Sequence, residues 1–402
     1  MLIAYLIISR CNKLRFKESF KDANAKIAFA FATLLIMIVS ACGFTYISIE
    51  IDGMAGGQMG SASSVEYKAV TTYDKNTNVS NQNYEASDSD TLAVMVMNKI
   101  NAVLKDFTLT KTGSSNGGDN TSFYGVNSGI IAKDGANLEI DGAEITTDAN
   151  GANGIFSFGG TVMSGYQADS GDGTSVTVRD TKITTKQDQS GGIMTTGGGI
   201  MSAFDLIIET FGRSSAAIRS DRGGGTVNVD GGTYTTNGAG SPAIYCTAAI
   251  NVINSLLQAN ASEGVVIEGK NSVNLENCTV KDNNTTLNGQ STTYKNIFIY
   301  QSMSGDSSEG TSEFSAKDCN IETEKGDEFY VTNTDAIINL ENCTLSNNDS
   351  TGNFLRIQKD SWGSEGKNGG SVTLNMKDQK SLGNIVVDAI SSLIMNMTEG
   401  SY

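Results

Sequence analysis

Apolar residues recur along this chain in one spaced pattern, which appears nine times between Ala102 and Leu345. Each copy has apolar residues at relative positions zero, two and seven. The copies are Ala102/Leu104/Leu109, Leu138/Ile140/Ile145, Val176/Val178/Ile183, Met201/Ala203/Ile208, Val227/Val229/Tyr234, Ile250/Val252/Leu257, Val273/Leu275/Val280, Phe314/Ala316/Ile321 and Ile338/Leu340/Leu345. A spacing of two is the alternation of a β-strand, and the odd spacing that follows requires a bend. The residue four places after each start is always Asp, Asn or Gly, which tolerate a left-handed backbone.

A second apolar run precedes nearly every copy, as in Ile130-Ile131, Ile193-Met194 and Ile297-Phe298-Ile299. Copies start 23 to 41 residues apart, which fits coils of two or three short strands with insertions at one corner, such as 283–294 and 303–311. A unit with one buried edge cannot fold alone and must stack on its neighbours. The pattern predicts an all-β fold: a single-stranded right-handed parallel β-helix, or solenoid, over residues 91–402, preceded by an N-terminal signal or anchor helix.

Composition supports this interpretation. The chain has 45 Gly but a single Pro among 402 residues. Because proline cannot donate to a hydrogen-bonded ladder, a body made of central strands excludes it. A disordered Gly- and Asn-rich chain would share the polarity but not the fixed apolar spacing. We therefore expect one elongated domain.

The N-terminus predicts export. Residues 1–26 are basic, residues 27–41 are an apolar signal or anchor segment, and residues 42–90 are polar and read as a flexible tether. The segment Val39-Ser40-Ala41-Cys42 resembles a bacterial lipobox, which implies lipidation of Cys42. An uncleaved anchor and simple cleavage are the alternatives. Each of these three options predicts a cell-surface protein on the extracellular side. Lipidation would bind it to the membrane through a lipid, and an uncleaved segment would bind it through an anchor helix.

The net charge and the cysteine positions limit which partners and metal ions the chain is expected to bind. A net charge of −16 argues against nucleic acid as a partner. We expect no metal site and no cofactor, with calcium left open. Cys278, Cys319 and Cys343 occupy one repeat position, where buried thiols are favoured over a disulfide or a zinc site.

The chain has no histidine, which removes the commonest general base. The coils resemble the β-helix superfamily that includes pectate lyases, polygalacturonases and surface adhesins, and the resemblance covers about residues 91–402. Asn333-Thr334-Asp335 matches the first polygalacturonase motif, but neither an Asp-Asp pair nor a Gly-His-Gly follows it. The resemblance therefore implies the adhesin branch rather than an enzyme.

Charged and aromatic residues leave the second strand of several coils and are expected to line one edge. No catalytic residue is assigned, and the candidate ligand-binding residues are Arg219, Asp221, Arg222, Tyr245, Glu268, Lys270, Tyr300, Arg356, Lys359, Asp360 and Trp362. Aromatic rings with Arg and Asp suit an extended glycan, and a protein ligand is also compatible. The alternatives are a solvated corner of a structural stalk, or a polysaccharide lyase or glycoside hydrolase without histidine.

The C-terminal coils depart from the pattern. If Val372 and Leu393 start further copies, Met376 and Met397 stand where Asp, Asn or Gly is expected. No polar capping segment follows, so we expect that the chain is truncated or that another subunit covers this end.

Overall fold

The structure is a computed structural model that describes residues 65–160, 162 and 171–402. The chain divides into a unit of residues 1–63 and a unit of residues 64–402. The basic region 1–26, the apolar segment 27–41 and Cys42 lie outside the described residues. The account below concerns the second unit.

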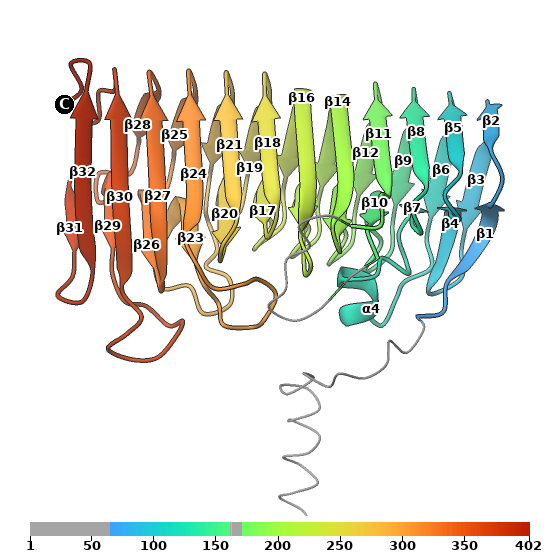
Figure 1. Cartoon of the computed structure of the whole chain (residues 1–402), viewed down its shortest axis with the longest axis horizontal. Helices are drawn as coiled ribbons and strands as arrows, with labels where there is room; N and C mark the ends of the chain where they lie inside the picture. The colour runs from blue at the N-terminus through green and yellow to red at the C-terminus, as the bar shows by residue number, and fades with distance from the viewer. Residues whose placement is uncertain (1–64, 161, 163–170) are drawn as a thin grey trace, which may run out of the picture. The chain divides into compact units, whose positions relative to one another are not determined.

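The described residues form two parallel sheets, of 12 and 20 strands, here named sheet 1 and sheet 2. Their strands lie side by side along one axis (Figure 1). Sheet 1 contains β1 (Lys68–Tyr73), β4 (Thr91–Val96), β7 (Ile130–Ala132), β10 (Ile155–Phe158), β13 (Ile193–Thr196), β15 (Ile218–Ser220), β17 (Ile244–Cys246), β20 (Val265–Glu268), β23 (Lys295–Tyr300), β26 (Asp327–Thr332), β29 (Leu355–Ile357) and β31 (Ile385–Val387).

Sheet 2 has two rows, which β14 and β16 join because each runs through both. The first row contains β2 (Thr77–Ser80), β5 (Asn101–Lys105), β8 (Asn137–Asp141), β11 (Ser175–Arg179), β14 (Gly199–Thr210), β16 (Gly225–Thr236), β18 (Ala249–Ile253), β21 (Ser272–Glu276), β24 (Ser312–Lys317), β27 (Thr334–Glu341), β30 (Gly370–Lys377) and β32 (Ser392–Thr398). The second row adds β3 (Asn83–Ala86), β6 (Thr108–Lys111), β9 (Glu144–Thr147), β12 (Lys182–Thr185), β19 (Leu256–Ala259), β22 (Thr279–Asp282), β25 (Asn320–Thr323) and β28 (Thr344–Asn347).

The parallel stacking predicted from the apolar pattern is confirmed. Equivalent apolar positions pair directly, so that Val227 lies opposite Ile250, which lies opposite Val273. Backbone φ angles are positive at all nine expected bend positions, from 44° at Asp180 to 76° at Gly231. The bend between the two rows of sheet 2 is therefore set by residues that accept a left-handed backbone.

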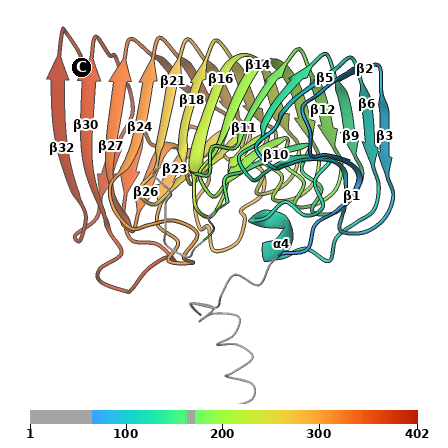
Figure 2. The ribbon, with the colours of Figure 1, turned by 45° about the vertical axis from the view of Figure 1, so that its right-hand side comes forward.

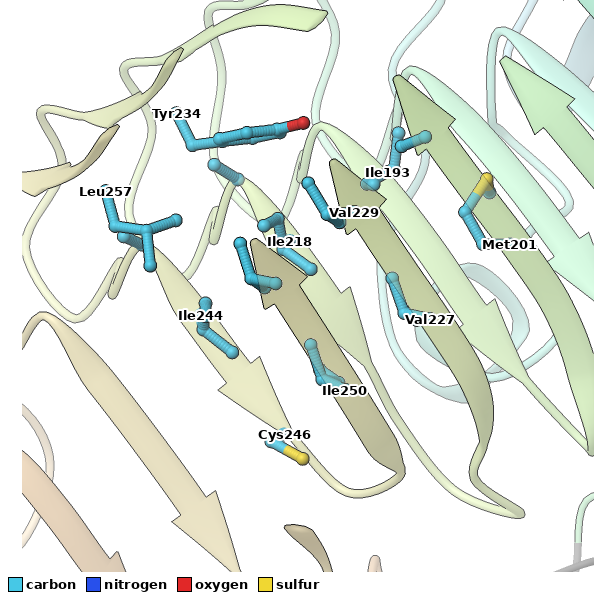
Figure 3. Packing of buried hydrophobic residues seen from close by; sticks show 14 of the residues in the cluster. Ile193, Met201, Ile218, Val227, Val229, Tyr234, Ile244, Cys246, Ile250 and Leu257 are labelled. Atoms are coloured by element: carbon cyan, nitrogen blue, oxygen red, sulfur yellow. The ribbon is translucent and has the colours of Figure 1, made fainter. Parts of the chain in front are cut away.

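The core runs along the interior of the stack and is built from all three rows. Ile218 and Ile244 of sheet 1 face the same interior as Val227, Val229 and Ile250 of sheet 2 (Figure 3). Each is at most 3% exposed. Because successive strands repeat the same inward position, each coil buries the apolar edge of the next.

The four cysteines of the described part are free thiols in this interior. Cys278, Cys319 and Cys343 occupy the one repeat position expected of them, and the backbone N–H of Cys278 donates to the Sγ atom of Cys319 at 3.5 Å. Burial raises the pKa of Cys246 to about 12, which favours the neutral thiol there.

The first coil of the solenoid begins nearer the N-terminus than predicted. Strands β1, β2 and β3 form a coil within residues 68–86, in a segment where a flexible tether was expected. The expectation was wrong there because Thr77 occupies the first apolar position, opposite Ala102. The other two positions are the apolar Val79 and Tyr84, and Asn81 makes the bend.

The assignment of the last copies was also wrong, by two residues. Leu374, rather than Val372, lies opposite Ile338, so the bend falls at Asp378, where φ is 46°. The next coil bends at Glu399, where φ is 55°. Asp378 therefore obeys the bend rule, and Glu399 departs from it.

Candidate functional site

The outward-facing residues of sheet 1 form a ladder in which a polar pair separates two largely apolar runs, and Arg356 follows the second run. Parallel pairing places one residue per strand in register from β7 to β26. In order, these residues are Ile131, Phe156, Met194, Arg219, Tyr245, Val266, Phe298 and Tyr330. Arg219 and Tyr245 therefore separate two apolar runs on the outside of the same sheet.

Connecting segments cover each apolar run. Tyr124, which follows the short helix α4 (Asp119–Ser122), and Val162 pack against the first run. Trp362 packs against the second run. Helix α4 and the long connections lie along one edge of the stack (Figures 1 and 2). Between the two covers, Arg219 and Tyr245 line an open hollow.

This hollow and its neighbour form what we name the central groove. The two parts have volumes of about 370 and 260 Å³ and share several lining residues. The shared residues are Gly240, Pro242, Tyr245, Asn288 and Tyr300. The larger part is the polar end, with Asp119, Arg219, Asp221 and Asp306 in its lining, and the smaller part is the aromatic end, with Phe298 and Trp362.

Two ion pairs organise the polar end. The Nη2 atom of Arg219 lies 2.8 Å from Asp221, and the Nη2 atom of Arg222 lies 2.7 Å from Asp306. Burial is the main cause that raises the pKa of Asp221 to about 6, against the lowering effect of Arg219. Within the described part, the buried Nη1 atom of Arg219 and Nε atom of Arg222 have no hydrogen-bond partner. These N–H groups remain as donors.

Glu268 lies behind the groove and holds its two central tyrosines. Its Oε2 atom accepts hydrogen bonds from Tyr245 at 2.6 Å and from Tyr300 at 3.0 Å. Its Oε1 atom accepts one from Ser302. Burial raises the pKa values of Glu268 and of both tyrosines. Glu268 therefore positions the two rings that join the polar and aromatic ends.

The aromatic end is a packed group of rings over a buried ammonium. Phe298 and Tyr300 stack with centroids 4.3 Å apart, and Trp362 lies 5.2 Å from Phe298 and 5.1 Å from Tyr300. The Nζ atom of Lys295 lies 4.1 Å from the Phe298 centroid and 3.6 Å from Glu263. Because Lys295 is fully buried, desolvation lowers its pKa.

The structure brings part of the predicted set together. Arg219, Asp221, Tyr245, Tyr300 and Trp362 line the central groove. The candidates Arg222 and Glu268 contact lining residues from behind, through the bonds described above.

Four candidates lie elsewhere, contrary to the expectation of one continuous edge. Lys270 lines a separate hollow of about 440 Å³. Arg356 pairs with Asp327. Asp360 accepts a hydrogen bond from Tyr330 at 2.5 Å, and the backbone N–H of Lys359 bonds to Asp388. The side chains of Arg356 and Asp360 therefore bond to a neighbouring coil instead of lining the groove, and Lys359 is held there by its backbone.

Sequence reasoning missed Asp119, Glu263, Asn288, Lys295 and Asp306. Asn288 and Asp306 come from the two insertions, 283–294 and 303–311, that interrupt the repeat. The position of an inserted side chain has no periodic signal. The insertions themselves were visible in the sequence, as the longest interval between copies.

Asp, Glu and Cys side chains of the described residues form no group of three or more arranged to hold a metal ion. Within the same residues, no helix is long and apolar enough to cross a bilayer. Comparisons of the chain with protein-family models, with curated proteins and with solved structures gave no match.

Proposed function

We propose that this chain is an exported, membrane-tethered surface protein of the right-handed β-helix, adhesin-like type, and that it binds a glycan in the central groove. The lipobox-like Val39–Cys42 segment supports export and tethering at the cell surface. The observation that carries glycan binding is the aromatic group of Tyr245, Tyr300 and Trp362 beside the donors and acceptors of Arg219 and Asp221.

Sugars offer an apolar ring face and polar hydroxyls, and the groove offers a match for each. The half-buried rings of Tyr300 and Trp362 provide apolar area held at low entropic cost. The unpartnered Nη1 atom of Arg219 can donate to a hydroxyl oxygen, and Asp221 can accept from a hydroxyl. A few directed polar groups in a largely preformed hollow are typical of ligand sites.

Binding can be tested with the full chain, purified in detergent, on a glycan array and then by calorimetry with the sugars that bind. Trp362→Ala should weaken binding about tenfold or more, because a central Trp is a typical energetic hot spot. Tyr402→Ala is the control, since Tyr402 is a 61% exposed aromatic residue that does not line the groove. Absence of any glycan binding, or equal loss in both variants, would overturn the proposal.

A catalytic role is the second candidate, and it rests on Asp221. A carboxyl with a pKa of about 6 is partly protonated near neutrality and suits a general acid for glycoside cleavage. Asp306 is close enough to contribute to this raised pKa. Release of reducing ends or unsaturated uronates from a bound glycan, lost in Asp221→Asn, would favour the enzyme. Saturable binding without product would favour the adhesin.

The absence of a cofactor stays a prediction, with calcium left open.

A further inference from the structure

We infer, on the basis of the proposed glycan-binding function, that the central groove selects amino sugars that carry a protonated, unacetylated amine over uronic acids and over their N-acetylated counterparts. Three features of the groove favour this selection: its charges, its aromatic rings and the internal pairing of its cations.

Carboxylates outnumber cations around the groove. Among the described residues, the lining contains the carboxylates Asp119, Asp221, Asp306 and Glu263 and a single cation, Arg219. The groups behind the lining are one further carboxylate, Glu268, and three cations, Arg222, Lys295 and Arg213.

Three of these cations already have a carboxylate partner. Arg219 pairs with Asp221, Arg222 with Asp306, and Lys295 with Glu263. Asp119, by contrast, has no ion-pair partner within the described part. An incoming uronate would have to compete with these internal carboxylates and would meet like charge at short range. An incoming ammonium would meet the carboxylate of Asp119, which has no internal ion-pair partner among the described residues.

The aromatic end favours the same ligand. The faces of aromatic rings attract cations, most strongly where water is excluded. The groove already shows this contact internally, because the Nζ atom of Lys295 lies 4.1 Å from the Phe298 centroid and 5.9 Å from that of Trp362. Carboxylates next to aromatic rings are a recurring way to recognise ammonium groups, and the two ends of the groove provide both.

An unpartnered donor in the lining fits a sugar and not merely a cation. The Nη1 atom of Arg219 has no hydrogen-bond partner within the described part, although it is buried. A buried donor without a partner costs free energy, which a ligand oxygen can recover. An amino sugar offers a hydroxyl oxygen for this donor together with an ammonium for the carboxylates.

The test compares three oligosaccharides of matched length by calorimetry with the full chain at neutral pH, where Asp221 is mostly ionised: glucosamine, N-acetylglucosamine and galacturonate oligomers. The glucosamine oligomer should bind at least tenfold more tightly than the N-acetylated one, and its affinity should fall with added salt. The galacturonate oligomer should bind most weakly. Equal or better binding of the N-acetylated or uronate oligomer would overturn this inference and leave the proposed function standing. Failure of all three sugars, and of a wider glycan array, would overturn the proposed function itself.

Substitutions separate charge selection from folding. Asp306→Asn and Asp221→Asn should each lower, several-fold, the ratio of the affinity for the glucosamine oligomer to that for the N-acetylated oligomer, because each removes a carboxylate from the lining. Asp335→Asn, which removes an exposed carboxylate at a different hollow, is the matched control. An unchanged preference in both groove variants, with thermal stability retained, would overturn the assignment. Because Asp306 lies in an insertion, its variant remains informative if Asp221→Asn destabilises the fold.

Discussion

The outer faces of the two sheets differ, although both sheets bury their inner faces in the same core. The outer face of sheet 2 is polar and repeats from strand to strand. The Nδ2 atom of Asn251 donates to Asn228, and that of Asn274 donates to Asn251, each at 2.9 Å. The outer face of sheet 1 is largely apolar and is covered by connecting segments.

This difference indicates where a binding site can arise in a stacked fold. In a ladder of matched amides, the side chains of neighbouring strands hydrogen-bond to one another. Such a face needs no connecting segment to cover it. An apolar outer face requires cover, and the cover consists of insertions, which vary freely because only their ends are fixed by the stack. The central groove lies where the two covers stop, over Arg219 and Tyr245.

Removing one ring from the apolar ladder of sheet 1 should lower the free energy of unfolding most. Phe298→Ala deletes a buried ring that contacts Tyr300 and Trp362, and large-to-small changes of this kind cost about 3–5 kcal/mol. Asn274→Ala, on the outer face of sheet 2 in the preceding coil, should cost below about 1 kcal/mol. Urea unfolding followed by circular dichroism measures both. Similar midpoints for the two variants would contradict the contrast between the faces.

The pH dependence of stability should reveal a buried acid in sheet 1. Burial raises the pKa of Glu328 to about 8 from 4.5, and its Oε2 atom has no hydrogen-bond partner within the described part. The folded chain therefore keeps a proton that the unfolded chain has released, and the free energy of unfolding falls as pH rises between about pH 5 and pH 8. The contribution is at most about 1.4 kcal/mol per pH unit.

Glu328→Gln should make this decline shallower, as measured by urea unfolding at a series of pH values. A residual slope is expected, because burial also raises the pKa of Asp282 to about 7. Glu139→Gln, at an exposed position on sheet 2, is the control. An identical slope in wild type and Glu328→Gln would show that Glu328 is ionised in the folded chain.

A substitution at the bend between the two rows of sheet 2 should have a smaller effect on stability. Asn277 has a φ of 52° and donates to Asn254 at 2.8 Å. Asn277→Ala should cost about 1–2 kcal/mol, because alanine keeps a Cβ atom in the left-handed region but lacks the amide whose hydrogen bonding makes asparagine tolerate it. Asn277→Gly should cost less, since glycine accepts this backbone. If glycine proves the worse replacement in thermal unfolding, the amide bond rather than the backbone angle sets the cost.

The smallest effect should come from the charged ladder on sheet 2. Lys377 lies 3.2 Å from Glu341, and both side chains are well exposed. Exposed ion pairs add little to stability. Lys377→Gln should therefore leave the unfolding midpoint unchanged within error, at low and at high salt. A clear loss at low salt would show that the outer face of sheet 2 depends on charge as well as on its amides.

Much of the fold could be predicted from spacing alone, and the exceptions are informative. The apolar pattern identified the paired positions from Ala102 to Leu345 and the left-handed bends. The pattern failed where a polar residue occupies an apolar position, as at Thr77. It also failed where a shift of two residues preserved the alternation of the strand, as at Val372. A strand pattern of period two is ambiguous to such a shift, and only pairing with the neighbouring strand resolves it.

The site was less accessible to sequence reasoning. Tyr245, Tyr300 and Trp362 could be proposed because the coils place residues after equivalent strands near one another. Lys270 and Arg356 were proposed on the same grounds but lie outside the groove. Lys270 lines another hollow, and Arg356, although in register with Tyr330, pairs with Asp327.

From Ala102 to Leu345, the sequence by itself determined the coil, its bend and its stacking register, because each depends on contacts between equivalent positions of neighbouring coils. Only the tertiary structure decided where the outer face of sheet 1 stays open. That opening depends on contacts such as Arg222 with Asp306 and Arg213 with Asn288, between residues 84 and 75 positions apart. Contacts from insertions across several coils follow no repeat, because their geometry is fixed by packing and not by spacing along the chain.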